Sequence, residues 1–278
     1  MIKIKFFIDS GKIEEIERVK SYGLLDGVTT NPSLIKKAVE SEKQKGRVVD
    51  MEKYIKEMIL IAKGLPVSLE VIGTTYEEMV SEGRKLYEKF NPIADNVYVK
   101  IPASPSTEEN NENNFDGIKA IKELTGMNIR VNCTLVFTPE QALSASKAGA
   151  RFVSPFTGRV DDYIRFKNKV QFDKSDYFPG SGIEKSGGVL EDNGITSGVD
   201  LVEQIVITFD NYDIRHTEVL AASIRNTRQL REVALAGADI ATIPMDVFEK
   251  MVSHYKTMEG MRKFIEDIVP EYSGIFKD

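Results

Sequence analysis

Short apolar runs recur along the chain, and most are separated by a segment long enough to form one helix. The runs cover residues 4–8, 25–29, 66–71, 96–101, 129–135, 151–154, 218–222 and 240–243. Helical periodicity is found at residues 12–22, 52–63, 76–90, 115–124, 139–148, 199–209, 227–236 and 246–254. Strands that alternate with helices form a parallel sheet, and eight such units close naturally into a barrel. The sequence therefore predicts an α/β protein of the (β/α)8 TIM-barrel class, with one domain over residues 1–278.

The main alternative fold is an open, doubly wound parallel sheet. Such a sheet is expected to carry a glycine-rich phosphate loop after an early strand. The chain contains neither a G-x-G-x-x-G nor a Walker sequence. A length of 278 residues also suits one barrel, because α/β barrels of this size form a single domain.

Four segments do not belong to a minimal barrel. Residues 36–50 are charged, and we expect a broken helix and a loop there. Residues 104–114 form a polar loop after the fourth strand, and residues 163–196 form an inserted loop after the sixth. A loop this long is either a surface excursion or a functional element such as a lid or a subunit contact. Residues 256–278 are predicted to form a C-terminal helix and tail.

The C-terminal helix has an apolar face. Its apolar side chains recur at helical spacing, which suits docking against the barrel or against a neighbouring subunit. They are Met258, Met261, Phe264, Ile265 and Ile268.

Composition narrows the classes of function. A net charge of −6 argues against nucleic-acid binding, and no run approaches the roughly 18 apolar residues of a membrane span. The first strand meets Asp9 too early for a signal peptide. A single cysteine, Cys133, excludes an internal disulfide framework, and with only two histidines a Cys/His metal site is not expected. We therefore expect a cytoplasmic protein without a metal or cofactor, which could still bind an anionic metabolite through a local basic cluster.

Polar residues lie at the ends of seven predicted strands. In barrel enzymes the active site forms at the C-terminal ends of the strands. Together these residues would bring a lysine nucleophile, carboxylates, hydroxyls, amides and two arginines to one mouth. They are Asp9; Thr29, Thr30 and Asn31; Ser68 and Glu70; Lys100; Asn132 and Thr134; Ser154 to Arg159; and Ser223 to Asn226.

Lys100 is the most informative of these residues. Strand alternation puts Lys100 on the same face as Tyr98, opposite to Val99. Both faces of a barrel strand are covered, so Lys100 would point into a crowded interior, where lysine is rare without a purpose. Burial favours the neutral amine, which is the nucleophile of Schiff-base chemistry. Position alone also allows a structural lysine paired with Asp9 or Glu70, or one that reaches the rim.

Carboxylates and arginines could complete such a site. Asp9 and Glu70 end different strands and could act as two acid/base groups, or as a helix cap and a structural ion pair. Arg159 and Arg225 offer forked donors that suit a phosphate. Arg225 follows the seventh strand, where barrels often bind phosphate. This pattern favours a phosphorylated substrate.

Smaller polar residues could orient that substrate. Thr134, Asn31 and Ser154 could hold a polyol through hydroxyl and amide hydrogen bonds, or could cap helices. Cys133 has the opposite parity to Thr134, so we expect it to face the helices as a small buried hydrophobe.

In their order along the chain, these motifs resemble those of the transaldolase family in its short form. The resemblance covers most of the sequence. The matching pieces are Phe7-Ile8-Asp9-Ser10, Gly27-Val28-Thr29-Thr30-Asn31-Pro32-Ser33, Ser68-Leu69-Glu70-Val71, Val97-Tyr98-Val99-Lys100-Ile101-Pro102, Asn132-Cys133-Thr134-Leu135, Gly149 to Arg159, and Ala221-Ala222-Ser223-Ile224-Arg225-Asn226.

The resemblance implies a role for each site residue. It implies that Lys100 forms the Schiff base, that Asp9 transfers the proton, and that Glu70 positions a catalytic water with Thr134. The hydroxyls of a three-carbon fragment and the substrate phosphate would each have their own ligands. These are Asn31, Asn132 and Ser154 for the hydroxyls, and Arg159, Ser223 and Arg225 for the phosphate.

The resemblance also implies an activity and an assembly. A dihydroxyacetone unit would pass from fructose 6-phosphate or sedoheptulose 7-phosphate to an aldose phosphate, within the pentose phosphate pathway and without a metal. Short-form relatives often form pentamers or decamers in which the C-terminal helix docks on a neighbour, so we expect a homo-oligomer. Insertions at 104–114 and 163–196 depart from the short form, and they could close over the site, alter the acceptor or change the assembly.

Two other functions compete with transaldolase. Fructose-6-phosphate aldolase, which releases dihydroxyacetone, favours Gln at the position of Glu70 and Tyr at the position of Phe156. Both residues of this chain side with transaldolase, and Glu can move protons whereas Gln can only orient water. The remote alternative is a non-catalytic barrel that binds sugar phosphates. Such a protein would have little reason to keep Lys100, Asp9 and Glu70 together.

Overall fold

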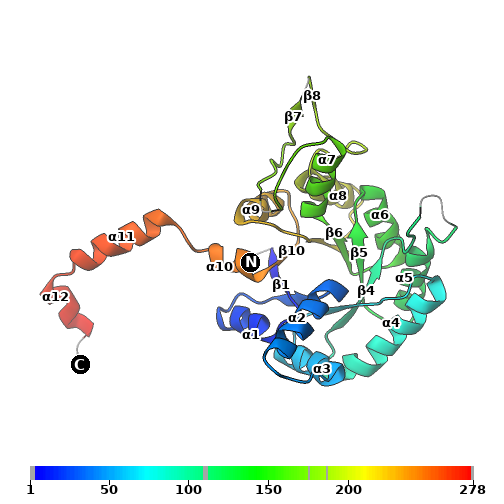
Figure 1. Ribbon diagram of the computed structural model, residues 1–278, viewed down its shortest axis with the longest axis horizontal. Helices are drawn as coiled ribbons and strands as arrows, with labels where there is room; N and C mark the ends of the chain where they lie inside the picture. Colours follow the sequence, from blue (N-terminus) through cyan, green and yellow to red (C-terminus); the bar gives the residue numbers. More distant parts are fainter. Residues whose placement is uncertain (1–3, 109–111, 175, 186, 277–278) are drawn as a thin grey trace.

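Eight parallel strands pair side by side and close into a barrel in the computed structural model, which confirms the predicted (β/α)8 fold (Figure 1). The order around the barrel is β1-β10-β9-β6-β5-β4-β3-β2, so each barrel strand pairs with the barrel strands before and after it along the chain, and the last strand, β10, closes the ring against β1. The strands are β1 (Lys5–Asp9), β2 (Gly27–Thr29), β3 (Val67–Glu70), β4 (Val97–Pro102), β5 (Val131–Val136), β6 (Phe152–Pro155), β9 (Glu218–Ala221) and β10 (Ile240–Ile243).

The structure describes residues 4–108, 112–174, 176–185 and 187–276. The parts of the two predicted insertions and of the predicted C-terminal tail that fall on residues 109–111, 175, 186 and 277–278 lie outside this description.

Helices cover the outside of the barrel (Figure 1). They are α1 (Ile13–Ser21), α2 (Pro32–Gln44), α3 (Met51–Ile61), α4 (Tyr76–Phe90), α5 (Asp116–Gly126), α6 (Pro139–Ala148), α7 (Thr157–Lys167), α8 (Gly198–Asn211), α9 (Thr227–Leu235) and α10 (Met245–Lys250), with a 3-10 turn η1 (Asn91–Ile93) after α4. Within the described residues no helix is long and apolar enough to cross a membrane.

Apolar side chains form two separate cores. The inner core fills the barrel, where the rings of Phe7 and Phe152 meet edge to face with centroids 5.9 Å apart and Tyr98 stacks on Phe152 at 4.6 Å. The outer core lies between the strands and the helices and contains Val99 and Cys133. Strand alternation predicts this place for Cys133, since neighbouring Thr134 points to the other face of the strand. Burial raises the pKa of the Cys133 thiol to about 12.

Two segments contradict the predicted layout. Residues 36–50 do not contain a broken helix, because α2 continues without interruption to Gln44 and only the remainder is a loop. The predicted inserted loop at 163–196 begins too early, since α7 extends through Lys167. Helix α7 starts directly at the end of β6, where its first residues read as a continuation of the strand motif.

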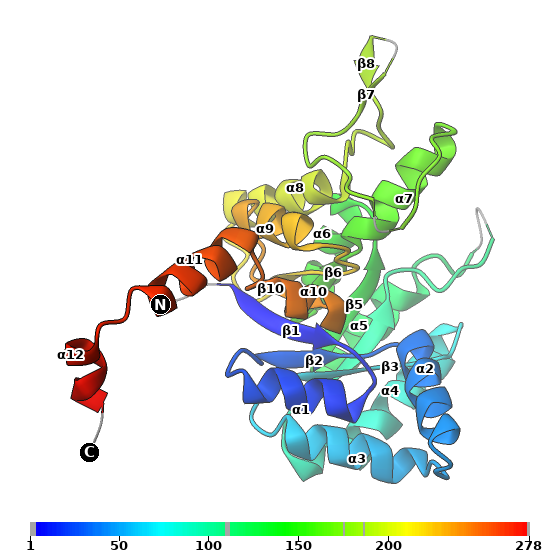
Figure 2. The ribbon, with the colours of Figure 1, turned by 60° about the vertical axis from the view of Figure 1, so that its left-hand side comes forward.

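The rest of the insertion projects from the rim and ends in a small hairpin of β7 (Glu184–Lys185) and β8 (Gly188–Val189) (Figure 2). At the other extreme, the C-terminal arm consists of α11 (Tyr255–Glu266), α12 (Pro270–Ser273) and η2 (Gly274–Phe276). It points away from the barrel, and none of the described residues in its helices is buried (Figure 2). Docking on the chain's own barrel, one of the two predicted arrangements, does not occur in this structure.

Gly117 allows α5 to pack closely on the end of β4, the strand that carries Lys100. A Cβ at Gly117 would lie 2.0 Å from the carbonyl oxygen of Pro102 and 2.7 Å from that of Ala103. Both obstacles are backbone atoms, which cannot move aside without shifting the strand end. Gly126, at the other end of the same helix, has no such neighbour within 4 Å.

We therefore predict opposite effects for two matched substitutions. Gly117→Ala should lower the free energy of unfolding by about 1–3 kcal/mol or more, because it overpacks the end of β4. Gly126→Ala should leave stability unchanged or raise it by up to about 1 kcal/mol through helix propensity. Urea unfolding followed by circular dichroism measures both values. Equal effects of the two substitutions would contradict the close packing at Gly117.

Candidate active site

Lys100 lies inside the barrel in the middle of β4, with 3% of its surface exposed. Strand register places Glu70 beside it on β3 and Asn132 beside it on β5. Its Nζ atom donates a hydrogen bond to the carbonyl oxygen of Thr30 at 3.0 Å and lies 3.1 Å from Oε2 of Glu70. The ring of Phe156 is 5.9 Å from the same Nζ atom. The amine is therefore held by short contacts to Glu70 on β3 and to the backbone just after β2.

A buried chain of hydrogen bonds fixes Asn132. Its Nδ2 atom donates to Oγ of Ser68 at 3.1 Å, and its Oδ1 atom accepts from Oγ of Ser154 at 2.7 Å. All three side chains are at most 1% exposed. Such a satisfied polar network holds its members in one orientation, so Asn132, which pairs with Lys100 by strand register, and Ser154, which lines the cavity, are both held rigidly.

Asp9 lies at the end of β1 and lines the same cavity as Lys100. Its Oδ1 atom accepts a hydrogen bond from Oγ1 of Thr29 at 2.7 Å, and that hydroxyl lies 2.5 Å from Oγ1 of Thr242 on β10. Burial raises the pKa of the Asp9 carboxyl, while the charge of Lys100 and the hydrogen bond from Thr29 oppose that rise. The environment thus keeps a carboxyl group near the amine and makes it a better proton acceptor than an exposed aspartate.

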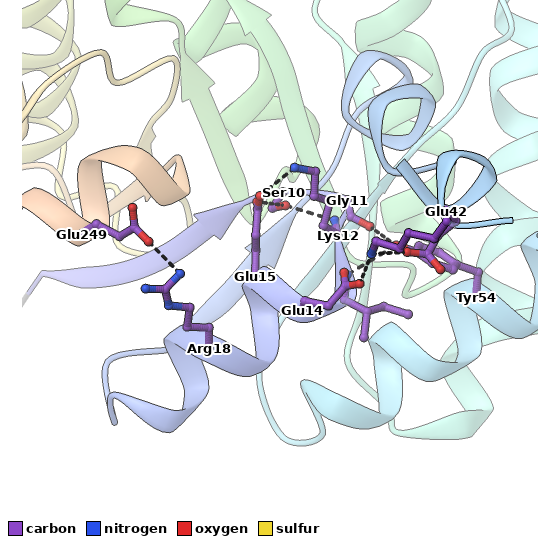
Figure 3. Close-up of polar contacts among 11 residues, drawn as sticks. Ser10, Gly11, Lys12, Glu14, Glu15, Arg18, Glu42, Tyr54 and Glu249 are labelled. Carbon is purple, nitrogen blue, oxygen red and sulfur yellow. Dashed lines mark hydrogen bonds and ion pairs between the residues drawn. The ribbon is translucent and has the colours of Figure 1, made fainter. Parts of the chain in front are cut away.

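The loop after Asp9 is held by its own polar contacts (Figure 3). Oγ of Ser10 donates to Oε2 of Glu15 at 2.5 Å and accepts from the backbone N–H of Lys12 at 3.0 Å. The Tyr54 hydroxyl donates to the carbonyl oxygen of Gly11 at 3.0 Å. These contacts fix the backbone that leaves β1, and with it the end of the strand that carries Asp9.

The Thr134 hydroxyl is buried without a hydrogen-bond partner among the described residues. Oε2 of Glu70 is also buried, and its contact with Lys100 lies outside hydrogen-bond geometry although the distance suits an ion pair. A buried polar atom without a partner costs free energy unless a bound polar group satisfies it. Thr134 and Glu70 therefore offer binding capacity to a small polar molecule or to part of a substrate.

Two arginines lie toward the outer end of the cavity. Arg159 is exposed at the start of α7, with its guanidinium 5.0 Å from the centre of the Phe156 ring. Arg225 is paired with Asp162 at 2.9 Å between Nη2 and Oδ2. Ser223 has a left-handed backbone with φ of +61°, a strained conformation for a residue other than glycine, and such strain is often found at functional sites.

A buried carboxyl links α7 to the Arg225 loop. Asp161 accepts from the backbone N–H of Gly198 at 2.7 Å and from Nε2 of Gln229 at 2.7 Å. Gln229 in turn accepts from the backbone N–H of Arg225 at 2.8 Å. Burial raises the pKa of Asp161 to about 7. These bonds hold the two arginine-bearing segments at a constant separation.

A cavity of about 400 Å³ brings most of the predicted site residues together. Those that line it are Asp9, Asn31, Lys100, Ser154, Phe156, Arg159, Ser223 and Arg225. The cavity lining does not include Glu70, Asn132 or Thr134. Strand register nevertheless places Glu70 and Asn132 on either side of Lys100. Asn31 also caps α2, because its Oδ1 atom accepts from the backbone N–H of Leu34 at 2.9 Å.

Several residues of the cavity wall were not predicted. Thr242 is the next-to-last residue of the apolar strand β10 and belongs to no motif, although its inward parity would have indicated it. Lys37 and Lys174 come from α2 and from the insertion, and no periodic pattern points them toward the site. The cavity wall also contains Thr29, which was predicted at a strand end, and Ser33, Leu34, Leu220 and Ala222.

A closed barrel whose strand ends gather a buried lysine, carboxylates and arginines around one cavity defines a (β/α)8-barrel enzyme. Residues 6–273 match the family model described as transaldolase/fructose-6-phosphate aldolase. A probable transaldolase from Chlorobium phaeobacteroides is 42% identical over 95% of this chain and 96% of its own. Probable transaldolases from Thermoplasma acidophilum and Bartonella henselae are 39% and 38% identical over 95% of this chain, and over 95% and 96% of theirs. The chain belongs to the transaldolase/fructose-6-phosphate aldolase family.

The Thr29 hydrogen bond yields a prediction for the pH dependence of activity. An ionised Asp9 would be the active base, so activity should fall as pH drops through its raised pKa. Thr29→Val removes a hydrogen bond that stabilises the charged form, so the acid limb of the kcat/KM profile should move to higher pH. Initial rates over a pH series measure this shift. An acid limb that stays in place, or moves to lower pH, would show that the Asp9 carboxyl does not set it.

Proposed function

We propose that this protein is a transaldolase that transfers a dihydroxyacetone unit between sugar phosphates through a Schiff base on Lys100. The observation that carries the proposal is the setting of Lys100. Its amine is buried, contacts Glu70, adjoins Asn132 and opens into a cavity that also holds Asp9 and two arginines. A neutral amine at this place can attack a carbonyl carbon, and the neighbouring carboxylates can move the protons that the reaction requires.

In the first stage Lys100 attacks C2 of a ketose phosphate such as fructose 6-phosphate or sedoheptulose 7-phosphate. Glu70 lies 3.1 Å from the amine and can accept its proton. The carbinolamine then loses water to form the iminium. We expect Glu70 and Thr134 to hold that water and to orient water for the final hydrolysis of the imine. Both carry a buried oxygen without a hydrogen-bond partner in the described part of the chain.

In the second stage Asp9 removes the proton from the C4 hydroxyl as the C3–C4 bond breaks. The electron pair of that bond moves to the iminium nitrogen, which leaves an enamine of dihydroxyacetone on Lys100 and releases an aldose phosphate. An acceptor such as erythrose 4-phosphate then takes the fragment, and Asp9 returns the proton to the new C4 oxygen. Because the iminium is the electron sink, the reaction requires no metal.

Polar wall residues would hold the substrate during both stages. The amide of Asn31 and the buried Asn132–Ser154 pair would bind the hydroxyls of the three-carbon fragment. Arg159 and Arg225, with Ser223, would bind the phosphate, and the ring of Phe156 would pack between the amine and Arg159. We place the reaction among the pentose phosphate interconversions and the protein in the cytoplasm, which its sugar-phosphate substrates favour.

We also propose a homo-oligomer, of which a pentamer or decamer is one form. The C-terminal arm supports this, since its apolar side chains are exposed and the described part of its own barrel does not cover them. More than half of the surface of each is in contact with solvent, which is costly for large apolar groups. They are Met258, Met261, Phe264, Ile265 and Ile268.

Substitution of Glu70 tests the function and the role of its carboxylate. The wild-type enzyme should transfer the fragment from fructose 6-phosphate to erythrose 4-phosphate much faster than it releases dihydroxyacetone. Glu70→Gln should slow transfer by about 10²-fold or more, because an amide cannot exchange protons, and should shift the remaining turnover towards release. Coupled assays of both products give the ratio. The exposed Glu77 provides a control, and Glu77→Gln should change neither rate.

Release as fast as transfer in the wild type would favour the aldolase function, and neither product would exclude both enzyme functions. An unchanged ratio of transfer to release in Glu70→Gln would contradict the proposed role of Glu70 in positioning the water.

Removal of residues 255–278 tests the assembly. None of the described residues in the arm helices is buried, so the truncated barrel should still fold, with an unfolding midpoint lowered only by the stabilisation that assembly supplies. Its mass in solution, measured by light scattering, should drop to that of a smaller species. Phe264→Asp in the full chain should have the same effect, whereas Lys263→Gln should not. A full chain that is already monomeric would contradict the proposal.

A further inference from the structure

The inserted segment after α7 returns to the substrate cavity. Lys174 lines the cavity together with Arg159 and Arg225, although it lies beyond the end of the helix that begins beside Arg159. We propose that Lys174 is a specificity-determining residue that binds the phosphate of the sugar substrate. The proposal rests on the proposed function in one respect, namely that the substrate carries a phosphate.

Arg165 anchors the insertion to α7. This arginine is 5% exposed, and its Nη2 atom donates to the carbonyl oxygens of Asp176 at 3.3 Å and Tyr177 at 2.8 Å. Its guanidinium also lies 5.0 Å from the ring centres of both Phe172 and Phe178. A buried arginine held by two carbonyls and two rings is costly to displace. These contacts hold Asp176 and Tyr177, which follow Lys174 along the chain, against α7.

Two hydrogen bonds join Asp173 and Asp176, the described residues on either side of Lys174. The backbone N–H of Asp173 donates to Oδ2 of Asp176 at 2.8 Å, and the N–H of Asp176 donates to the carbonyl oxygen of Asp173 at 2.9 Å. Just beyond the turn, the Tyr177 hydroxyl donates to Glu232 on α9 at 2.6 Å. Tyr177 thus links the segment that carries Lys174 to α7 and to α9, the helices that follow β6 and β9.

The charges around Arg159 and Arg225 leave a role for a further cation in binding a phosphate. Asp162 pairs with Arg225 and offsets part of its charge. A sugar phosphate carries close to two negative charges at pH 7. Arg159 and Lys174 have no ion-pair partner in the described part of the chain, and neither has Lys37, which lines the same cavity, so these three residues supply the unbalanced positive charge. The carboxylate of Asp176, two residues after Lys174, accepts a hydrogen bond from the backbone N–H of Asp173.

Binding of inorganic phosphate to the full-length protein tests this role without requiring turnover. Isothermal titration calorimetry at low ionic strength should show about three- to tenfold weaker binding for Lys174→Gln, the loss expected for one partly exposed charge-assisted contact. Lys174→Arg should restore most of the affinity. Lys185 lies on the hairpin of the same insertion but not on the cavity, so Lys185→Gln should bind phosphate as the wild type does.

Kinetics then show whether the contact acts on substrate. Lys174→Gln should raise KM for fructose 6-phosphate by a similar factor with little change in kcat, and it should leave turnover of unphosphorylated fructose unchanged. Unchanged phosphate affinity in Lys174→Gln, or an equal loss in Lys185→Gln, would overturn the proposal. Phosphate binding that depends on Lys174 in a protein without transfer activity would reject the proposed function and support this inference.

Discussion

The contact between Lys100 and Glu70 inside the barrel is the interaction on which the rest of the site depends. Both side chains come from neighbouring strands and are paired by register, so the closed sheet sets their separation. Breaking such a buried pair by removing one partner typically costs about 3–5 kcal/mol, because the other is left without compensation. The barrel therefore maintains a polar pair in an apolar interior, and the stability that this requires comes from the two apolar cores around it.

The residues around this pair fall into two sets that differ in what holds them. The inner residues are held by neighbouring strands, and the outer residues by helices and loops. Inner residues are held by side-chain bonds between strands, as in the Ser68–Asn132–Ser154 chain. Outer residues are held through helix starts and loops, as in the link from Asp161 through Gln229 to the loop of Arg225. Chemistry at Lys100 requires side chains held rigidly between strands, whereas recognition of a phosphate tolerates support from helix starts and loops.

Much of the fold and of the inner site could be predicted from the sequence, because both follow from period-2 alternation and from the ends of strands. Lys100 and Asp9 were found in this way, and so was the outward parity of Cys133. The start of helix α7 was harder to predict, because its first residues, Thr157 and Gly158, belong to a motif that is typical of a strand end. The Thr29–Thr242 contact joins residues far apart in sequence, and only barrel closure brings them together. The position of Lys174 depends on a buried arginine between two rings, which no periodic pattern indicates.

The central claim is that the amine of Lys100 forms a covalent imine with the substrate. Reduction with borohydride in the presence of fructose 6-phosphate, followed by peptide mass spectrometry, tests it most directly. We expect a reduced three-carbon adduct on Lys100 in the wild type and none at this position in Lys100→Arg. Two other lysines, Lys37 and Lys174, line the same cavity and serve as internal controls. An adduct on either of them, or no adduct in a folded protein that binds the sugar phosphate, would contradict the account.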